Sequence, residues 1–133
     1  MKFYKLMDGE RVISEILSDQ DLEKKLIEIR DSPNYSNPIL TLVDPLGNTL
    51  TIGISKNLGF LNFIDSSGNP PYFSSVGNRS LSETNEIMVF YIEGKHFTEV
   101  PKRNCIPIET LIEVTKEYIK TGNLSTVINW EKD

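Results

Sequence analysis

The sequence predicts an α+β protein, and three observations support this fold class. Short apolar runs separated by turn residues fill the middle of the chain, an amphipathic segment ends near Asp31, and a second one runs to about Tyr118. The 133 residues, with glycines and prolines spread along the chain, suit one domain that buries about two-thirds of the surface its unfolded form exposes. We therefore expect a single domain over residues 1–133.

The N-terminal segment predicts a hairpin followed by a helix. Asp8-Gly9 separates two strand-like runs, residues 2–7 and 10–17, and suits a tight hairpin turn. Ser18 is a suitable N-cap, because its hydroxyl can accept a hydrogen bond from a backbone N–H of the first turn. The predicted helix runs from there to about Asp31, and its apolar face carries Leu22, Leu26 and Ile29.

The middle of the chain predicts strands. Residues 39–43 form an apolar run, residues 44–48 a turn, and residues 49–54 alternate apolar with polar or small side chains. Residues 60–64 form a third run. Residues 87–92 are apolar at six successive positions, which predicts a strand covered on both faces and therefore central in its sheet.

The second helix has the clearest pattern. Pro107 fits its first turn, and Gly122 supplies the left-handed position that ends it. One face carries Ile108, Leu111, Ile112, Thr115, Tyr118 and Ile119. The opposite face carries Glu109, Glu113 and Glu117, interleaved with Lys116 and Lys120. This interleaving favours a solvated face with local ion pairs over an acidic docking stripe.

The charge balance disfavours nucleic acid and anionic lipid as partners. The formal net charge is -5 and the pI is near 4.9, so the chain attracts basic partners. The most basic pair, Lys102-Arg103, lies close to Glu99 and reads as a solvated loop. The start of the chain lacks the apolar region of a signal peptide, and no apolar run approaches the ~20 residues of a membrane helix. We expect a cytoplasmic location.

The inventory for catalysis is poor. His96 is the only histidine and falls in a predicted turn, while Cys105 is the only cysteine and reads as a small buried hydrophobe. Glu83 and Glu86 read as charged loop, and no glycine pattern matches a phosphate-binding loop. We expect no enzyme activity, no metal and no cofactor. An enzyme that uses His96 or Cys105 stays open as an alternative.

An ordered set of short segments resembles immunity protein family one of bacterial polymorphic toxin systems. The resemblance covers about residues 39 to 131, and one proline usual after the Thr-Gly pair is replaced here by Asn123-Leu124-Ser125. The matching segments are Thr51-Ile52-Gly53-Ile54, Gly59-Phe60-Leu61-Asn62-Phe63, Tyr72-Phe73-Ser74-Ser75, Phe90-Tyr91 with Gly94, Thr98-Glu99-Val100-Pro101, Ile106-Pro107, Tyr118, Thr121-Gly122 and Trp130.

The resemblance implies an antiparallel β-sheet of about five to seven strands with two main α-helices packed on it. It also implies a protein that binds and neutralises a cognate toxin domain, often a nucleic-acid deaminase and in some cases a nuclease. An enzyme that handles polynucleotides has an electropositive cleft, into which an acidic inhibitor is steered. An acidic adaptor or secretion chaperone is the alternative. Strand edges and the exposed helix face could each pair two copies, so a monomer and a homodimer are both open.

Acidic and aromatic side chains in loops and at strand ends are the candidates for partner binding, because they combine negative charge with apolar contact area. The candidates are Asp44, Asp65, Tyr72, Glu83, Glu86, Glu93, Glu99 and Trp130.

Overall fold

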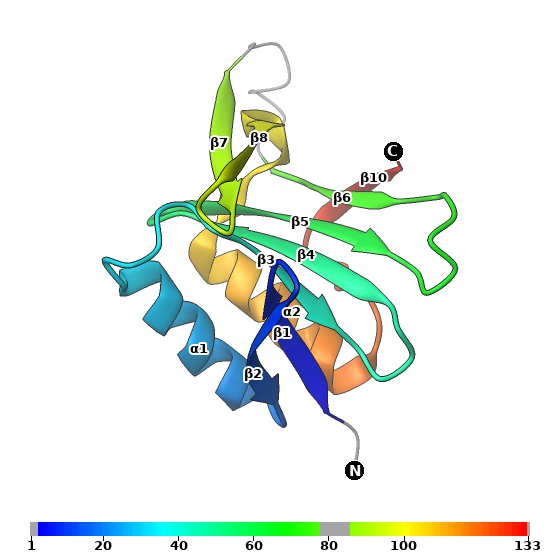
Figure 1. Ribbon diagram of the computed structural model, residues 1–133. Helices are drawn as coiled ribbons and strands as arrows, with labels where there is room; N and C mark the ends of the chain where they lie inside the picture. Colours follow the sequence, from blue (N-terminus) through cyan, green and yellow to red (C-terminus); the bar gives the residue numbers. More distant parts are fainter. Residues whose placement is uncertain (1–2, 78–85, 133) are drawn as a thin grey trace.

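A computed structural model describes residues 3–77 and 86–132 of the chain (Figure 1). The strands are β1 Tyr4–Asp8, β2 Arg11–Ile16, β3 Ile39–Val43, β4 Thr49–Ile54, β5 Leu58–Ile64, β6 Phe73–Val76, β7 Ile87–Ile92, β8 His96–Pro101, β9 Ile106–Pro107 and β10 Asn129–Lys132. The helices are α1 Asp19–Asp31, α2 Ile108–Thr121 and the short 3-10 helix η2 Lys102–Asn104. None of the helices in the described ranges is long and apolar enough to cross a membrane.

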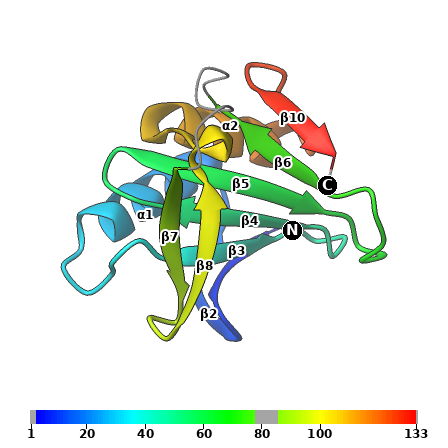
Figure 2. The same ribbon diagram turned by 90° about the horizontal axis from the view of Figure 1, so that it is seen from above.

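The strands form two sheets that lie in different layers. The large sheet has the order β10-β6-β5-β4-β3-β1-β2, with β9 added to β5, and every neighbouring pair is antiparallel. Helices α1 and α2 cover one face of it, and the β7–β8 hairpin crosses the other (Figure 2). The predicted α+β architecture is confirmed, with ten strands in the described residues instead of five to seven.

The N-terminal hairpin and α1 form as the sequence predicts. The two-residue turn is Gly9-Glu10, one position later than expected, and Gly9 has a φ of +62° that glycine adopts without strain. The Ser18 hydroxyl accepts a hydrogen bond from the backbone N–H of Asp21 at 3.1 Å, which caps α1. Leu22, Leu26 and Ile29 are buried against the large sheet's core.

Helix α2 ends as predicted and begins one residue later. Pro107 occupies the N-cap position directly before the helix, where its missing N–H costs nothing. Gly122 adopts a left-handed φ of +75°, and its N–H donates to the carbonyl oxygen of Tyr118 at 2.7 Å.

The lysines on the polar face of α2 join the two helices. Lys116 Nζ lies 3.6 Å from Glu113, a local pair as predicted, but it also lies 3.2 Å from Glu23 of α1. Lys120 Nζ lies 3.4 Å from Asp19, at the first turn of α1. Glu113 is thus paired with a lysine of the same face, and Lys116 and Lys120 also bind carboxylates of α1, as a solvated face with ion pairs requires.

Strand alternation divides the large sheet into two faces. The apolar side chains on the face toward the helices are fully buried and form the main core with Leu111 and Tyr118. These sheet residues are Leu6, Leu40, Leu42, Leu50, Ile52 and Leu61. The other face carries polar residues such as Thr51, Asn62 and Ser74 in register across β4, β5 and β6. That face is where the β7–β8 hairpin packs.

The prediction that residues 87–92 form a central, doubly buried strand is wrong. Strand β7 pairs only with β8 among the described strands, and Ile87 keeps 48% of its surface exposed. Phe90 is the one fully buried side chain of β7. It packs on Phe60 of β5, with ring centroids 5.0 Å apart and planes at 71°, an edge-to-face contact. The apolar run thus serves a hairpin that buries one face and exposes the other.

Gly53 makes room for this aromatic contact. A Cβ at position 53 would overlap the ring of Phe60 and lie 3.1 Å from Phe90 Cδ1. The two rings form a second apolar cluster with Ile39, Val100 and Cys105, between the sheet and the hairpin. The absent side chain at Gly53 therefore sets how closely the hairpin approaches the sheet.

We predict that Gly53→Ala lowers the free energy of unfolding by about 1–3 kcal/mol, because the added methyl overpacks the Phe60–Phe90 contact. Urea unfolding measures the loss, and amide exchange in β7 should accelerate as the hairpin loosens. Gly68→Ala is the control, since position 68 has a positive φ but no atom within 4 Å of an added Cβ. It should leave exchange in β7 unchanged. A Gly53→Ala protein as stable as wild type would contradict this packing account.

Candidate protein-binding surface

The two side chains best suited to nucleophilic chemistry do not form a catalytic pair. Cys105 is buried in the second apolar cluster, as predicted, and its thiol donates to the carbonyl oxygen of Pro101 at 3.9 Å. Burial raises the pKa of the Cys105 thiol to about 11, which suppresses the thiolate. His96 is exposed and begins β8 instead of lying within the turn.

The described residues also offer no metal centre. Within residues 3–77 and 86–132, no group of three or more His, Cys, Asp or Glu side chains is placed to hold a metal ion.

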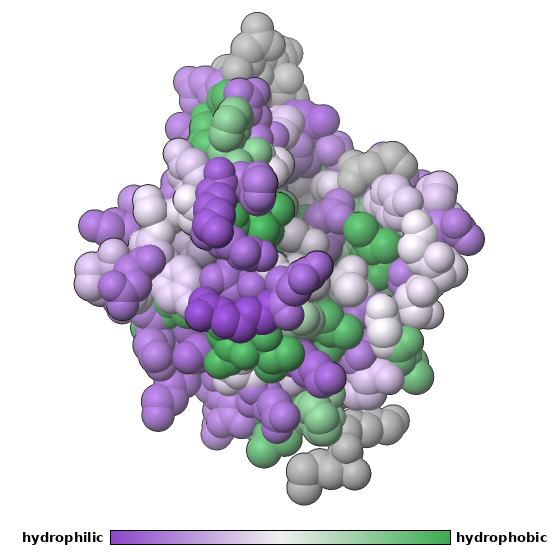
Figure 3. Space-filling view, viewed as in Figure 1, coloured by the Kyte–Doolittle hydropathy of each residue, from purple (hydrophilic) through white to green (hydrophobic). Residues whose placement is uncertain are grey.

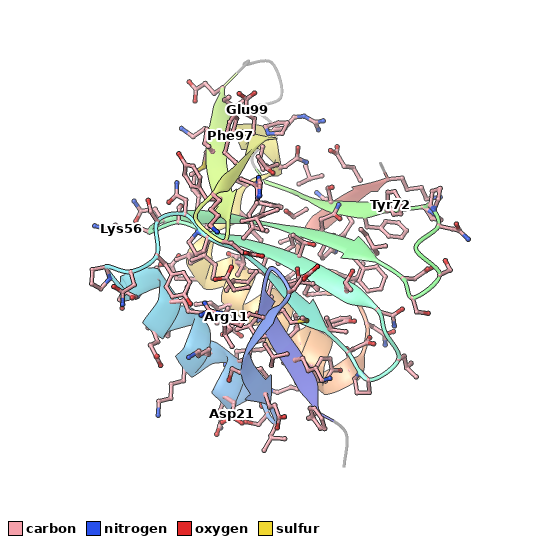
Figure 4. The ribbon with its side chains drawn as sticks, in the orientation of Figure 1. Arg11, Asp21, Lys56, Tyr72, Phe97 and Glu99 are labelled. Carbon is pink, nitrogen blue, oxygen red and sulfur yellow. The ribbon has the colours of Figure 1, made fainter. Side chains whose placement is uncertain are left out.

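Seven of the eight predicted partner-binding residues are described by the structure, and they lie in three separate places. Figure 4 shows Tyr72 on the side of the β5–β6 loop, apart from Glu99 on the hairpin. Glu83 lies outside the described residues. The loop end of the sheet holds Asp44, Asp65 and Tyr72, the hairpin holds Glu86, Glu93 and Glu99, and β10 holds Trp130. Only the hairpin brings several predicted carboxylates onto one element.

Asp44 is engaged inside the protein. Its Oδ1 accepts backbone N–H bonds from Leu46 and Asn48, each at 2.9 Å, which closes the β3–β4 turn. Its Oδ2 accepts the Asn48 amide at 2.9 Å and the Tyr118 hydroxyl of α2 at 2.7 Å. Partial burial works to raise the pKa of Asp44, but these hydrogen bonds outweigh it and hold the pKa below its usual value.

The pKa of Tyr118, the partner of Asp44, shifts in the opposite direction. Burial, followed by its hydrogen bond to the Asp44 carboxylate, raises the pKa of the Tyr118 phenol above its ordinary value. The hydroxyl therefore stays protonated and serves as a donor, so the contact ties α2 to the β3–β4 turn.

Asp65 and Tyr72 shape the β5–β6 loop. Asp65 Oδ1 accepts hydrogen bonds from the backbone N–H and the hydroxyl of Ser67, and the first of these is 2.9 Å long. The hydroxyl bond from Ser67 contributes most to lowering the pKa of Asp65. The Tyr72 hydroxyl donates to the carbonyl oxygen of Gly68 at 2.8 Å. Both side chains thus stabilise their own loop.

Trp130 is half-buried and packs against the main core. Its indole Nε1 donates to the carbonyl oxygen of Ser125 at 2.8 Å, which holds the segment before β10 in place. The ring therefore has a structural contact that accounts for its position.

A polar network that the sequence did not suggest fixes the end of the hairpin. Asn104 donates to the carbonyl oxygen of Ser75 at 2.9 Å and to Glu131 Oε1 at 2.8 Å. Arg103 Nη1 donates to Glu131 Oε2 at 2.7 Å, and this bond is the main cause that lowers the pKa of Glu131. The partners are 27 to 29 residues apart in sequence, beyond the reach of local patterns. Through them η2, directly after β8, is tied to β6 and β10.

The hairpin presents an apolar face with acidic neighbours to solvent. Phe90 and Val100 are buried toward the sheet, so alternation turns Phe97 and Glu99 away from it. Phe97 keeps 64% of its surface exposed, and Tyr91 lies opposite it in the register. Figure 3 shows hydrophobic surface on this projecting hairpin among hydrophilic groups. Phe97 was not among the predicted partner-binding residues. Strand alternation, which puts Phe97 on the face opposite the apolar Val100, could have indicated that it is exposed.

The predicted acidic residues of the hairpin lie at its two ends and on β8. Glu86, before β7, pairs with Lys102 Nζ at 3.2 Å and stays exposed. Glu93 occupies the β7–β8 turn with a positive φ of 54° and lies beside Gly9. Residues 86–101 carry these two carboxylates and Glu99 against the single lysine Lys95. With Glu86 paired to Lys102, Glu93 and Glu99 stand against Lys95, so the element is weakly acidic as well as apolar.

A cleft of about 430 Å³ lies between β8 and the open face of the large sheet. Ile39, Phe60 and Val100 supply apolar lining, and Thr51 and Thr98 supply hydroxyls. The paired side chains of Arg103 and Glu131 also border it. The cleft runs along β8, since the four successive residues from Thr98 to Pro101 line it together with residues of the sheet. It is a groove that suits an extended chain segment.

A comparison with protein families identifies the family of this chain. Residues 10–132 match the family model described as Immunity protein Imm1. The matched span contains both long helices and every strand from β2 to β10, and it begins earlier than the resemblance in the sequence, which starts near residue 39. A comparison with curated proteins finds no match.

We predict that Asp44→Asn lowers the free energy of unfolding by about 1–3 kcal/mol at pH 7, because charge-assisted hydrogen bonds are lost. The pKa of Asp44 in the fold lies below its ordinary value of 3.8. Its ionised form therefore stabilises the fold above that pH, and the contribution disappears as the pH falls through the folded pKa.

Urea unfolding of wild type and Asp44→Asn between pH 7 and pH 2.5 tests this sign. The difference between the two proteins should shrink on the acidic side. Glu117→Gln, on the exposed face of α2, serves as the control and should show little difference at any pH. A difference that grows as the pH falls would contradict the assignment.

Proposed function

The chain belongs to the Imm1 family of immunity proteins, and from that premise we propose that it binds a toxin domain encoded beside it and neutralises that toxin. The family match over residues 10–132 carries this proposal, because it spans nearly the whole fold. We propose further that the protein acts in the cytoplasm by covering the active site of the toxin, and that it transforms no molecule of its own.

The charge of the protein supports a toxin that acts on nucleic acid, a deaminase or a nuclease. Such an enzyme binds a polyanion and carries an electropositive cleft, whereas this chain has a net charge of -5. Opposite charge accelerates the encounter and orients the partners. The same charge disfavours nucleic acid as the direct ligand of this protein.

Inhibition by binding needs no reactive side chain, and the buried Cys105 thiol is a poor nucleophile. The Cys105 thiol is buried, and burial raises its pKa to about 11. An inhibitor requires a stable surface instead, and the described fold supplies one in the hairpin that projects from the sheet.

We predict that co-expression of this chain restores growth to cells that make the toxin domain of the neighbouring gene. The purified proteins should form a complex, and the toxin in that complex should lose its activity on nucleic acid. A chain without the Imm1 match and with similar charge is the control and should give no protection. Failure to bind or protect would contradict the proposed function, as would turnover of a metabolite by the purified chain alone.

Salt dependence separates electrostatic steering from purely apolar docking. We predict that the association rate constant falls at least about tenfold from low salt to 0.5 M NaCl, because screening removes the long-range attraction. Stopped-flow mixing or surface plasmon resonance measures this rate. An association rate independent of salt would exclude an electropositive partner surface.

A further inference from the structure

The two outer edges of the β7–β8 hairpin differ in their backbone hydrogen bonding. At β7, the N–H of Tyr91 donates to the carbonyl oxygen of Asn37 at 2.8 Å, and the Asn37 side-chain amide donates to the carbonyl oxygen of Val89 at 3.0 Å. These bonds show that the odd-numbered residues of β7 direct their backbone groups away from β8. The loop before β3 therefore occupies the outer edge of β7.

The register carries this pattern over to β8. Tyr91 lies opposite Phe97, and Val89 lies opposite Glu99. In an antiparallel pair, two residues that lie opposite each other either both direct their backbone N–H and C=O groups toward the other strand or both direct them away from it. The partner of a residue with outward backbone groups therefore also has outward backbone groups. The backbone N–H and C=O groups of Phe97 and Glu99 thus face the free side of β8. No strand in the described part of the chain pairs with that side.

The surroundings of this open edge favour one kind of occupant. The 430 Å³ cleft runs along β8, with an apolar floor that includes Phe60 and Val100. Phe97, on the face of β8 that turns away from the sheet, is 64% exposed, and Glu99 is exposed as well. An exposed strand edge is a template for another strand, and a groove beside it can hold alternate side chains of an added segment.

We propose that the open edge of β8 is the toxin-binding site, and that it takes an extended, basic segment of the toxin domain as an added strand. This inference rests on the proposed function. Main-chain bonds to Phe97 and Glu99 supply the register, an apolar side chain of the segment enters the cleft, and a lysine or arginine of the toxin meets Glu99. The Phe97 ring packs on the toxin surface flanking the segment.

Charge favours a toxin over a second copy of this chain on the same edge. Two hairpins paired through β8 would place the exposed Glu99 carboxylates of both copies on the same paired edge. Like charges opposed across paired strands are destabilising. A basic segment gains attraction from the same groups.

The test measures binding of the purified, catalytically inactivated toxin domain of the neighbouring gene to wild type and to substituted proteins. Phe97→Ala and Glu99→Lys should each weaken the Kd at least about tenfold, as expected for a central anchor and a reversed charge. Glu99→Pro removes the outward N–H of β8 without touching a bond to β7, and should weaken binding by at least as much. Thermal unfolding checks that each protein is folded.

Matched controls carry the same chemical changes elsewhere. Leu46→Ala removes an apolar side chain that is 80% exposed on the β3–β4 turn, and Glu117→Lys reverses an exposed charge on α2. Both should bind within about twofold of wild type. Because Leu46 adjoins Asp44, its substitution also tests the loop end of the sheet as a rival surface.

The outcomes separate this inference from the proposed function. If wild type binds the toxin but Phe97→Ala, Glu99→Lys and folded Glu99→Pro bind equally well, the β8 site is wrong and the immunity function stands. If wild type does not bind the toxin, both fail. A wild-type dimer that Glu99→Pro converts to monomer would assign the edge to a second copy and overturn the proposal.

Discussion

The β7–β8 hairpin packs on the open face of the large sheet through the contact between Phe90 and Phe60. Gly53 leaves the space in which the rings of Phe60 and Phe90 meet edge to face. Without that close approach the hairpin would lose its apolar support on the sheet. The cleft beside β8 and the outward face that carries Phe97 both follow from this one contact.

Two polar anchors then fix the direction of the hairpin and make its edges unequal. The network of Asn104 with Ser75 and Glu131 holds the chain directly after β8. Asn37 holds the outer edge of β7. One edge is thus used within the fold while the other faces solvent, so the fold itself selects the strand that a partner can extend. In the function proposed above, the rigid support of this edge limits the entropy lost on binding.

Local patterns predicted the elements well because their causes are local. The Ser18 cap, the apolar face of α1 and the left-handed Gly122 each depend on residues within one or two helical turns. The antiparallel sheet with two helices followed from these elements and from the family resemblance. The prediction that residues 87–92 form a central strand is wrong, because an apolar run indicates burial but does not show which element covers the strand. Its inner face packs on the sheet, and its outer face stays exposed.

The candidate site was predictable only in part. The carboxylates of the hairpin could be picked out as exposed loop and strand-end charges, but Asp44 and Trp130 make internal contacts that only the folded chain reveals. Arg103 and Glu131 meet across 28 residues, and the open edge of β8 depends on strand register. Neither the Arg103–Glu131 pair nor the open edge of β8 produces a periodic pattern of residues in the sequence.

Amide hydrogen exchange of the free protein and of its toxin complex shows whether a toxin strand adds to β8. The amides of Phe97 and Glu99 should exchange fast in the free protein, since their N–H groups face outward, and become strongly protected in the complex. The amides of the β3–β4 turn and the β5–β6 loop should change little. Protection confined to those loops, with the two β8 amides still exchanging fast, would contradict the account.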